Sequence, residues 1–200
     1  MDPARSVFER FVPAPAVDYC AQLYHHLNFE FKVKRSRKTK FGDFRFDPRI
    51  KKYTITVNND LNPYAFLITY LHEVAHLVTS RDHGRKVLPH GKEWKANFKK
   101  ATLPVLNDQV FPKEVLQSLA KYLINPKASS CSDPILYQVL KQYDAPSDKV
   151  LLKTLQPGDE FEFNGKIFKY LSKRRTRIEC IELKTNRHYL INQVAEILRV

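Results

Sequence analysis

Residues 63–78 read PYAFLITYLHEVAHLV, and this stretch decides the fold that the sequence predicts. It is apolar almost all the way round a helical projection, which is typical of a helix buried at the centre of a domain. Asn62 or Asp60 can cap its N-terminus, and Pro63 falls in the first turn, where a missing backbone N–H is tolerated. We therefore predict a central helix from about residue 63 to about residue 78.

Two histidines and a glutamate interrupt this apolar stretch, at His72, Glu73 and His76. Residues four apart lie almost one above the other on a helix, so both imidazoles can face one metal ion. Burying these three groups without partners would cost several kcal/mol, which a bound metal would offset. The pattern is HExxH, in which the histidines hold a zinc ion and the glutamate is a general base. A chance match is the alternative, and the buried context disfavours it.

A catalytic zinc ion usually has three protein ligands and one open position. Three downstream residues are candidates for the third ligand, namely His83, His90 and Glu93. His90 comes just before a predicted helix and next to Gly91, which permits close approach of the backbone. The spacing of His83 and the surroundings of Glu93 fit known zinc-hydrolase patterns poorly. We favour one zinc ion held by His72, His76 and His90, with the other two residues as alternatives.

The remainder of residues 1–146 predicts one sheet and several further helices. Apolar residues at helical spacing indicate an amphipathic first helix, and three alternating runs indicate strands. A polar loop is expected over residues 80–89. The predicted helices span residues 16–27, 92–101, 113–123 and 133–143, and the predicted strands span residues 29–33, 41–46 and 53–57. We expect an α+β domain over residues 1–146, with a three-stranded antiparallel sheet beside the central helix.

From about residue 148 onward the sequence changes to short strand-like runs. These runs are LLKTL, EFEF, KIFKYL, RIECIEL and HYLIN. Asn164 and Gly165 separate two of them, and this dipeptide is a strong signal for a tight hairpin turn. We therefore predict a second domain over residues 147–200, a small all-β module that is barrel-like.

The chain is strongly basic, with 34 Lys and Arg against 21 Asp and Glu and a formal net charge of +13. Such a surplus favours polyanionic partners, of which nucleic acid is the commonest. Residues 32–52 hold ten basic and two acidic side chains, and a second basic group lies near residue 175. We predict DNA contacts at Lys32, Lys34, Arg35, Arg37, Lys38, Lys40, Lys173, Arg174, Arg175 and Arg177. A solvated basic surface, or a protein-docking face on the β module, is the alternative.

Several classes of protein are disfavoured by what the sequence lacks. No apolar run approaches the length of a membrane span, and the N-terminal residues have no signal-peptide core. The cysteines Cys20, Cys131 and Cys180 form no CxxC pair, which argues against a zinc ribbon and a disulfide framework. We expect a cytoplasmic protein with no membrane partner, and nucleoid association would follow from DNA binding. The role of Cys131 stays open, with a buried apolar position as the default.

The run HEVAHLVTSRDHGRKVLPHGKEWKANF, residues 72–98, resembles the SprT family. That family combines HExxH with a loop and then HGxxF or HGxxW, and both halves are present here. The resemblance covers about residues 15–125 and implies a zincin-like fold. It implies zinc ligands at His72, His76 and His90, a catalytic Glu73, and Trp94 as a packing residue behind the third ligand. The eukaryotic Spartan group within this family consists of DNA-dependent proteases that degrade proteins crosslinked to DNA.

The C-terminal part departs from the family pattern. Many bacterial SprT proteins end in a four-cysteine zinc ribbon, and a strand-rich module stands in its place here. Our leading hypothesis is a zinc endopeptidase associated with DNA that acts on DNA-bound or DNA-crosslinked proteins. Two alternatives are a zinc peptidase without a nucleic-acid role and a non-catalytic, zinc-stabilised DNA-binding or regulatory protein. A purely structural zinc site needs no general base, which disfavours the last of these.

Overall fold

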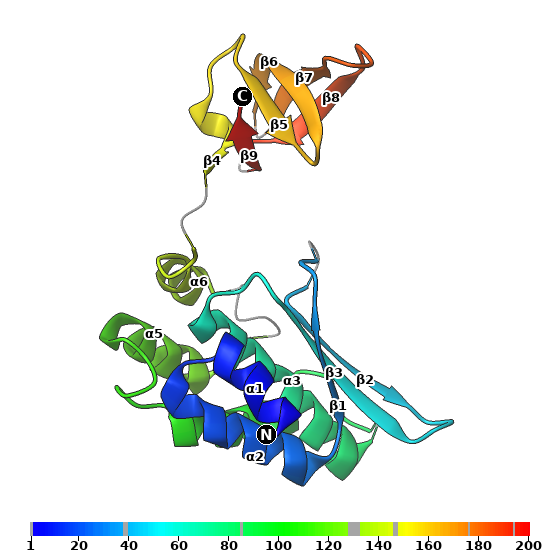
Figure 1. Ribbon diagram of the computed structural model, residues 1–200, viewed down its shortest axis with the longest axis vertical. Coiled ribbons are helices and arrows are strands. Elements are labelled where there is room, and N and C mark those ends of the chain that lie inside the picture. Colours follow the sequence, from blue (N-terminus) through cyan, green and yellow to red (C-terminus); the bar gives the residue numbers. More distant parts are fainter. Residues whose placement is uncertain are drawn as a thin grey trace. The chain divides into compact units, whose positions relative to one another are not determined.

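The structure is a computed structural model, which describes residues 2–37, 40–84, 86–127, 133–145, 148–175, 177–193 and 195–200. Two of the residues singled out in the sequence, Lys38 and Cys131, lie outside the described residues. The chain is α+β and divides into two compact units, residues 1–144 and residues 145–200 (Figure 1). None of the described helices has an apolar stretch long enough to cross a membrane.

The first unit contains six α-helices and a three-stranded sheet among its described residues. In chain order they are α1 (Pro3–Phe11), α2 (Val17–Leu27), β1 (Glu30–Lys34), β2 (Gly42–Asp47), β3 (Lys52–Asn58), α3 (Pro63–His83), α4 (Lys92–Thr102), α5 (Lys113–Ile124) and α6 (Pro134–Lys141). Short 3-10 turns occupy Ala14–Ala16 and Leu103–Val105. The first helix, α1, was not predicted from the sequence. Asp2 caps it through a hydrogen bond from the Ala4 N–H, and Phe8 on its inner face is fully buried.

The central helix α3 contributes many of the buried apolar side chains of this unit. Asn62 caps it by accepting a hydrogen bond from the Ala65 N–H at 3.0 Å, so Asn62 and not Asp60 is the cap. The helix contacts both β2 and β3, and apolar side chains such as Phe66 and Leu77 are fully buried around it. It ends at His83, five residues beyond the predicted end, so the start of the predicted loop is helical. The Arg81 guanidinium lies 4.6 Å from the Tyr53 ring centroid, a contact that holds this polar last turn on the sheet.

The sheet of the first unit has the order β1-β3-β2, with β1 parallel and β2 antiparallel to β3. The prediction of an antiparallel sheet was therefore wrong for β1. Strand alternation reports which side chains share a face, and it contains no information on strand direction. The described residues on the connection between β1 and β2 are held at Asn58, the last residue of β3. The Asn58 side-chain amide holds that connection by donating to the Arg37 and Lys40 carbonyl oxygens.

The second unit is a six-stranded antiparallel sheet with the order β4-β9-β5-β6-β7-β8. Its strands are β4 (Lys149–Leu151), β5 (Glu160–Phe163), β6 (Lys166–Arg174), β7 (Arg177–Glu182), β8 (His188–Asn192) and β9 (Glu196–Arg199). Asn164 and Gly165 both have positive φ in the β5–β6 turn, as the predicted hairpin requires. Among the described residues the edge strands β4 and β8 do not pair with each other, so the sheet does not close into a barrel. The last strand, β9, was not predicted, and it pairs with both β4 and β5.

Candidate metal centre

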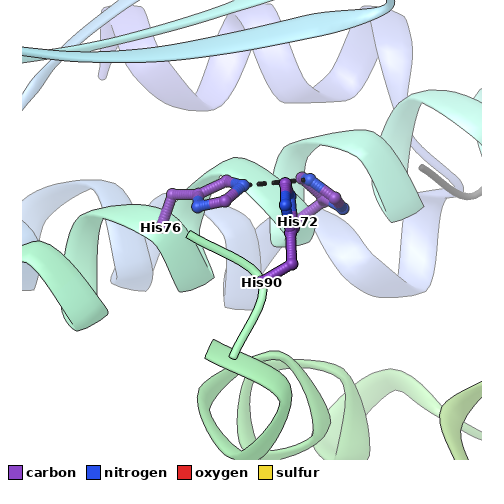
Figure 2. Close-up of side chains that lie close together, drawn as sticks. All are labelled: His72, His76 and His90. Atoms are coloured by element: carbon purple, nitrogen blue, oxygen red, sulfur yellow. Dashed lines mark hydrogen bonds between the residues drawn. The ribbon is translucent and has the colours of Figure 1, made fainter. Parts of the chain in front are cut away.

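Three histidines from two segments of the first unit converge (Figure 2). His72 and His76 lie one turn apart on α3, and His90 lies in the loop immediately before α4. One ligand atom from each ring lies within 4.8 Å of those of the other two. In the described part of the chain this is the one cluster of His, Cys, Asp or Glu side chains with metal-binding geometry. The two alternative ligands, His83 and Glu93, are not part of it.

The side chain of Trp94 holds the three imidazole rings in place. It is fully buried, and its ring centroid lies 4.6 Å from that of His72, 5.3 Å from that of His76 and 4.7 Å from that of His90. The ring of Phe98, one turn further along α4, stacks on the Trp94 ring, with the two ring centroids 5.2 Å apart. Because an aromatic stack fixes ring orientation, the histidines have little freedom to turn away from one another.

The same burial keeps all three imidazoles uncharged near neutral pH. Burial, together with the neighbouring imidazoles, lowers the pKa of His72 to about 3 and that of His76 to about 4. Burial also lowers the pKa of His90. Metal ions bind the neutral form of histidine, so protons compete weakly for this site at pH 7.

The geometry of the cluster fits a zinc ion. The Nε2 atoms of His72 and His76 are 3.2 Å apart. Two nitrogens at about 2.0–2.1 Å from a tetrahedral zinc ion would be separated by about 3.3–3.4 Å. The Nε2 atom of His90 is buried without a hydrogen-bond partner among the described residues. A buried polar atom without a partner is costly, and coordination of a metal ion would remove that cost.

The carboxyl group of Glu73 lies beside this cluster, one residue after His72 on α3, and only 7% of the residue is exposed. Burial, together with the nearby charge of Asp43, raises its pKa to about 8. Three groups act in the opposite direction, namely Arg37, Lys40 and the backbone N–H of Phe44, which hydrogen-bonds the carboxylate. The group is thus a carboxyl in a largely dry site, with a high proton affinity that is suited to general-base chemistry.

Room for this carboxyl group is made by Gly42 at the start of β2. A Cβ atom at position 42 would lie 2.5 Å from Oε1 and 2.8 Å from Cγ of Glu73. Gly42 does not have a positive φ, so its role is one of space and not of backbone conformation. This role of Gly42 is not predictable from the sequence, because nothing in the local pattern shows which helix the strand will contact.

The strand β2 is an edge strand, and its aromatic side chains continue the site away from the histidines. The Phe44 ring stacks parallel to that of His76, with centroids 6.4 Å apart. Tyr53 on β3 stacks between Phe44 and Phe46, at 6.2 Å and 4.6 Å respectively. Phe46 is 38% exposed, so this row of rings leads from the histidine cluster to the surface. The row offers apolar, aromatic surface next to the cluster.

The predicted DNA contacts of the first unit fall into two kinds. Lys32 pairs with Glu30 at 2.9 Å, Lys40 pairs with Asp43 at 2.7 Å, and Arg37 Nε donates to Asn58 Oδ1 at 2.7 Å. By contrast, Lys34 and Arg35 form no ion pair with any other described residue. The basic segment is therefore less available to phosphate than its composition indicates.

The second predicted group lies in the other unit, at the tip of the β6–β7 hairpin. Lys173, Arg174, Arg175 and Arg177 are all exposed, and Arg174 pairs with Glu179 at 2.8 Å. Arg175 has a positive φ of 42° in the turn. The structure thus gathers these four residues at one hairpin of the second unit.

Comparison with known proteins supports the resemblance over part of the chain. The chain is 32% identical over 93 residues to Protein SprT of Vibrio parahaemolyticus, a match that covers 46% of this chain and 46% of that protein. The chain thus matches less than half the length of that relative. No family model matches the chain, and no solved structure does. What these findings support is a likeness to SprT proteins.

Proposed function

We propose that this protein is a zinc-dependent peptidase of the SprT type. The observation that carries the proposal is the convergence of His72, His76 and His90 beside the buried carboxyl group of Glu73. The similarity to Protein SprT of Vibrio parahaemolyticus is independent support. A purely structural zinc site would gain nothing from a carboxyl group enclosed by Gly42 and the Phe44 N–H.

In this proposal His72, His76 and His90 hold one zinc ion, and a fourth position is left for water or substrate. Zinc, when bound, lowers the pKa of water and polarises the carbonyl of the peptide bond. Glu73 accepts the proton of the attacking water at a carboxylate oxygen and then delivers it to the leaving amine. The Phe44 N–H, together with Gly42, holds the carboxylate in position during both transfers. Trp94 and Phe98 exclude water from the side of the histidines that faces α4.

We further propose that the protein acts in association with DNA, on DNA-bound or DNA-crosslinked proteins. The support is the net charge of +13 and the exposed cations in both units, including Lys34, Arg35 and the hairpin tip at residues 173–177. Contacts with phosphate release bound counterions, so affinity of this kind falls steeply as salt is added.

The test is cleavage of an unstructured DNA-binding protein by the zinc-loaded chain, with and without single-stranded DNA. A chelator should abolish cleavage and added zinc should restore it, whereas DNA should stimulate it at low salt and progressively less as salt rises. Cleavage that survives complete zinc removal would refute the peptidase proposal. Zinc-dependent cleavage at the same rate with and without DNA would refute only the DNA part of the proposal. The function supported would then be that of a zinc peptidase without a nucleic-acid role.

Replacing Gly42 by alanine is expected to impair catalysis without removing zinc. The added methyl group would occupy the position 2.5 Å from Glu73 Oε1, so the carboxyl group must move away from its present site. A misplacement of about 1 Å in a catalytic group can cost about 100-fold in rate. Zinc content and kcat should be measured side by side, with Asp47→Ala at the other end of β2 as the control. Unchanged kcat in Gly42→Ala would show that β2 does not position Glu73.

A further inference from the structure

A pocket lies between α1 and β1, on the edge strand opposite to β2. Its lining contains three cations, Arg10, Lys34 and Arg35, and no carboxylate. Phe11 and Phe31 contribute apolar surface, and the remaining lining residues are Ser6, Val7, Val33 and Asn59. This is the composition of an anion site, because nothing in the lining neutralises the three positive charges.

The three cations are also free of partners elsewhere in the described part of the chain. No ion pair or side-chain hydrogen bond joins Arg10, Lys34 or Arg35 to another described residue. A second pocket, between α1 and α2, serves as a contrast: its Arg5 pairs with Asp18, and its His25 pairs with Asp2. Of the two, only the pocket beside β1 presents a concentrated charge that is not already satisfied.

The pocket is built on fixed elements. The Arg10 guanidinium lies 5.2 Å from the centroid of the Phe11 ring, and that ring stacks on the buried Phe66 at 5.0 Å. The Lys34 carbonyl accepts a hydrogen bond from the Asn59 N–H at 2.8 Å, which fixes the end of β1. Arg10 and Lys34 therefore extend from backbone that is already held in place. Because of this, the conformational entropy that the pocket loses on binding an anion is small.

We propose that this pocket binds the phosphate backbone of single-stranded nucleic acid. The cations would contact phosphate oxygens, and the half-buried Phe11 and Phe31 would give a base or sugar an apolar surface to rest on. A membrane surface is the less suitable partner, because none of the exposed large apolar side chains among the described residues lines this pocket. The inference rests on the DNA part of the proposed function and is independent of the peptidase chemistry.

The experiment is fluorescence anisotropy of a labelled single-stranded oligonucleotide titrated with the full chain at several salt concentrations. The pocket variant is Arg10→Gln/Lys34→Gln/Arg35→Gln. The control, Lys100→Gln/Lys113→Gln/Lys121→Gln, removes the same charge from exposed positions on α4 and α5. We expect the pocket variant to bind about tenfold or more weakly, with a salt slope smaller by about 2, since each phosphate contact on a single strand contributes about 0.7. The control should stay near wild type.

Equal losses in the pocket variant and the control would overturn the proposal, because attraction would then follow net charge alone. A wild-type chain that binds phosphatidylserine vesicles but not the oligonucleotide would also overturn it. The single variant Arg10→Gln guards against a folding defect in the triple variant, because Arg10 is exposed and outside the sheet. It should reproduce about a third of the change in salt slope, and no change in slope would count against the pocket. Loss of cleavage in the Glu73→Gln chain is a separate matter and leaves this result unaffected.

Discussion

Replacing Glu73 by glutamine should reduce peptide-bond cleavage by about 1,000-fold while zinc content stays at the wild-type level. Glutamine has nearly the same shape and can still hydrogen-bond the Phe44 N–H, but it cannot accept the proton of the attacking water. General-base catalysis contributes about 100- to 10,000-fold, which sets the expected range. The measurement is kcat on an unstructured protein substrate, with zinc determined in the same samples.

The control for this substitution is Glu93→Gln, on α4 and outside the histidine cluster. It should leave kcat within about twofold of wild type, since the Glu93 carboxylate lies outside the cluster and takes no part in the proposed chemistry. A Glu73→Gln chain that is fully active would show that Glu73 is not the general base. A chain that loses both zinc and fold would indicate a structural role for the carboxyl group instead.

The zinc-free protein offers a second readout for the same residue. Burial raises the pKa of Glu73 in the folded chain to about 8, from 4.5 for the exposed group. Between these two values the unfolded chain binds fewer protons than the folded chain, so ionisation of Glu73 lowers stability as pH rises. The Glu73→Gln chain lacks this penalty. Its urea midpoint relative to wild type should increase from pH 5 to pH 8, and a constant difference would contradict the burial of Glu73.

Replacing His90 by alanine should lower zinc affinity by more than 100-fold and abolish cleavage. Loss of a partner that only orients a zinc ligand already costs about 10- to 100-fold, so loss of a ligand must cost more. Competition with a chromogenic chelator measures the affinity directly. At the same zinc concentration, zinc should also raise the unfolding temperature of wild type more than that of the variant, because a weaker ligand stabilises the folded chain less.

The matched control is His83→Ala, at the exposed last residue of α3. It should bind zinc like wild type, because His83 is not part of the cluster. If His83→Ala lost zinc and His90→Ala retained it, the ligand set drawn from the structure would be wrong. Without zinc, the wild-type and His90→Ala chains should differ little in their free energy of unfolding, since His90 Nε2 has no hydrogen bond to lose among the described residues.

The sequence was most informative where one local pattern carried both the structure and the chemistry. The apolar run around HEVAH predicts α3 and its start at Pro63, and the four-residue spacing predicts that His72 and His76 share a face. His90, which is distant in sequence, could be favoured as the third zinc ligand from its position before a helix. Its contacts with Trp94 and with the histidines of α3 are visible only in the structure. The resemblance to the SprT family implied the same ligand set.

The sequence was least informative where function depends on contacts between distant segments. Alternation gave the strands of the first sheet but not the parallel direction of β1, because it contains no information on strand direction. Gly42 has no local signature, and its role appears only where β2 meets Glu73. Counting charges also overstated how many cations of the basic segment are unpaired, because Lys32 and Lys40 pair with acids close in sequence. Arg10, which lines the pocket beside β1, was not among the predicted contacts.

Zinc K-edge X-ray absorption on the zinc-loaded chain tests the central claim most directly. The account predicts one zinc ion per chain with four light-atom neighbours at about 2.0–2.1 Å, of which three are imidazole nitrogens and one is an oxygen. Multiple scattering from the imidazole rings should fall by one ring in the His90→Ala chain. A sulfur neighbour at about 2.3 Å, four imidazole ligands, or a chain that takes up no zinc would contradict the account.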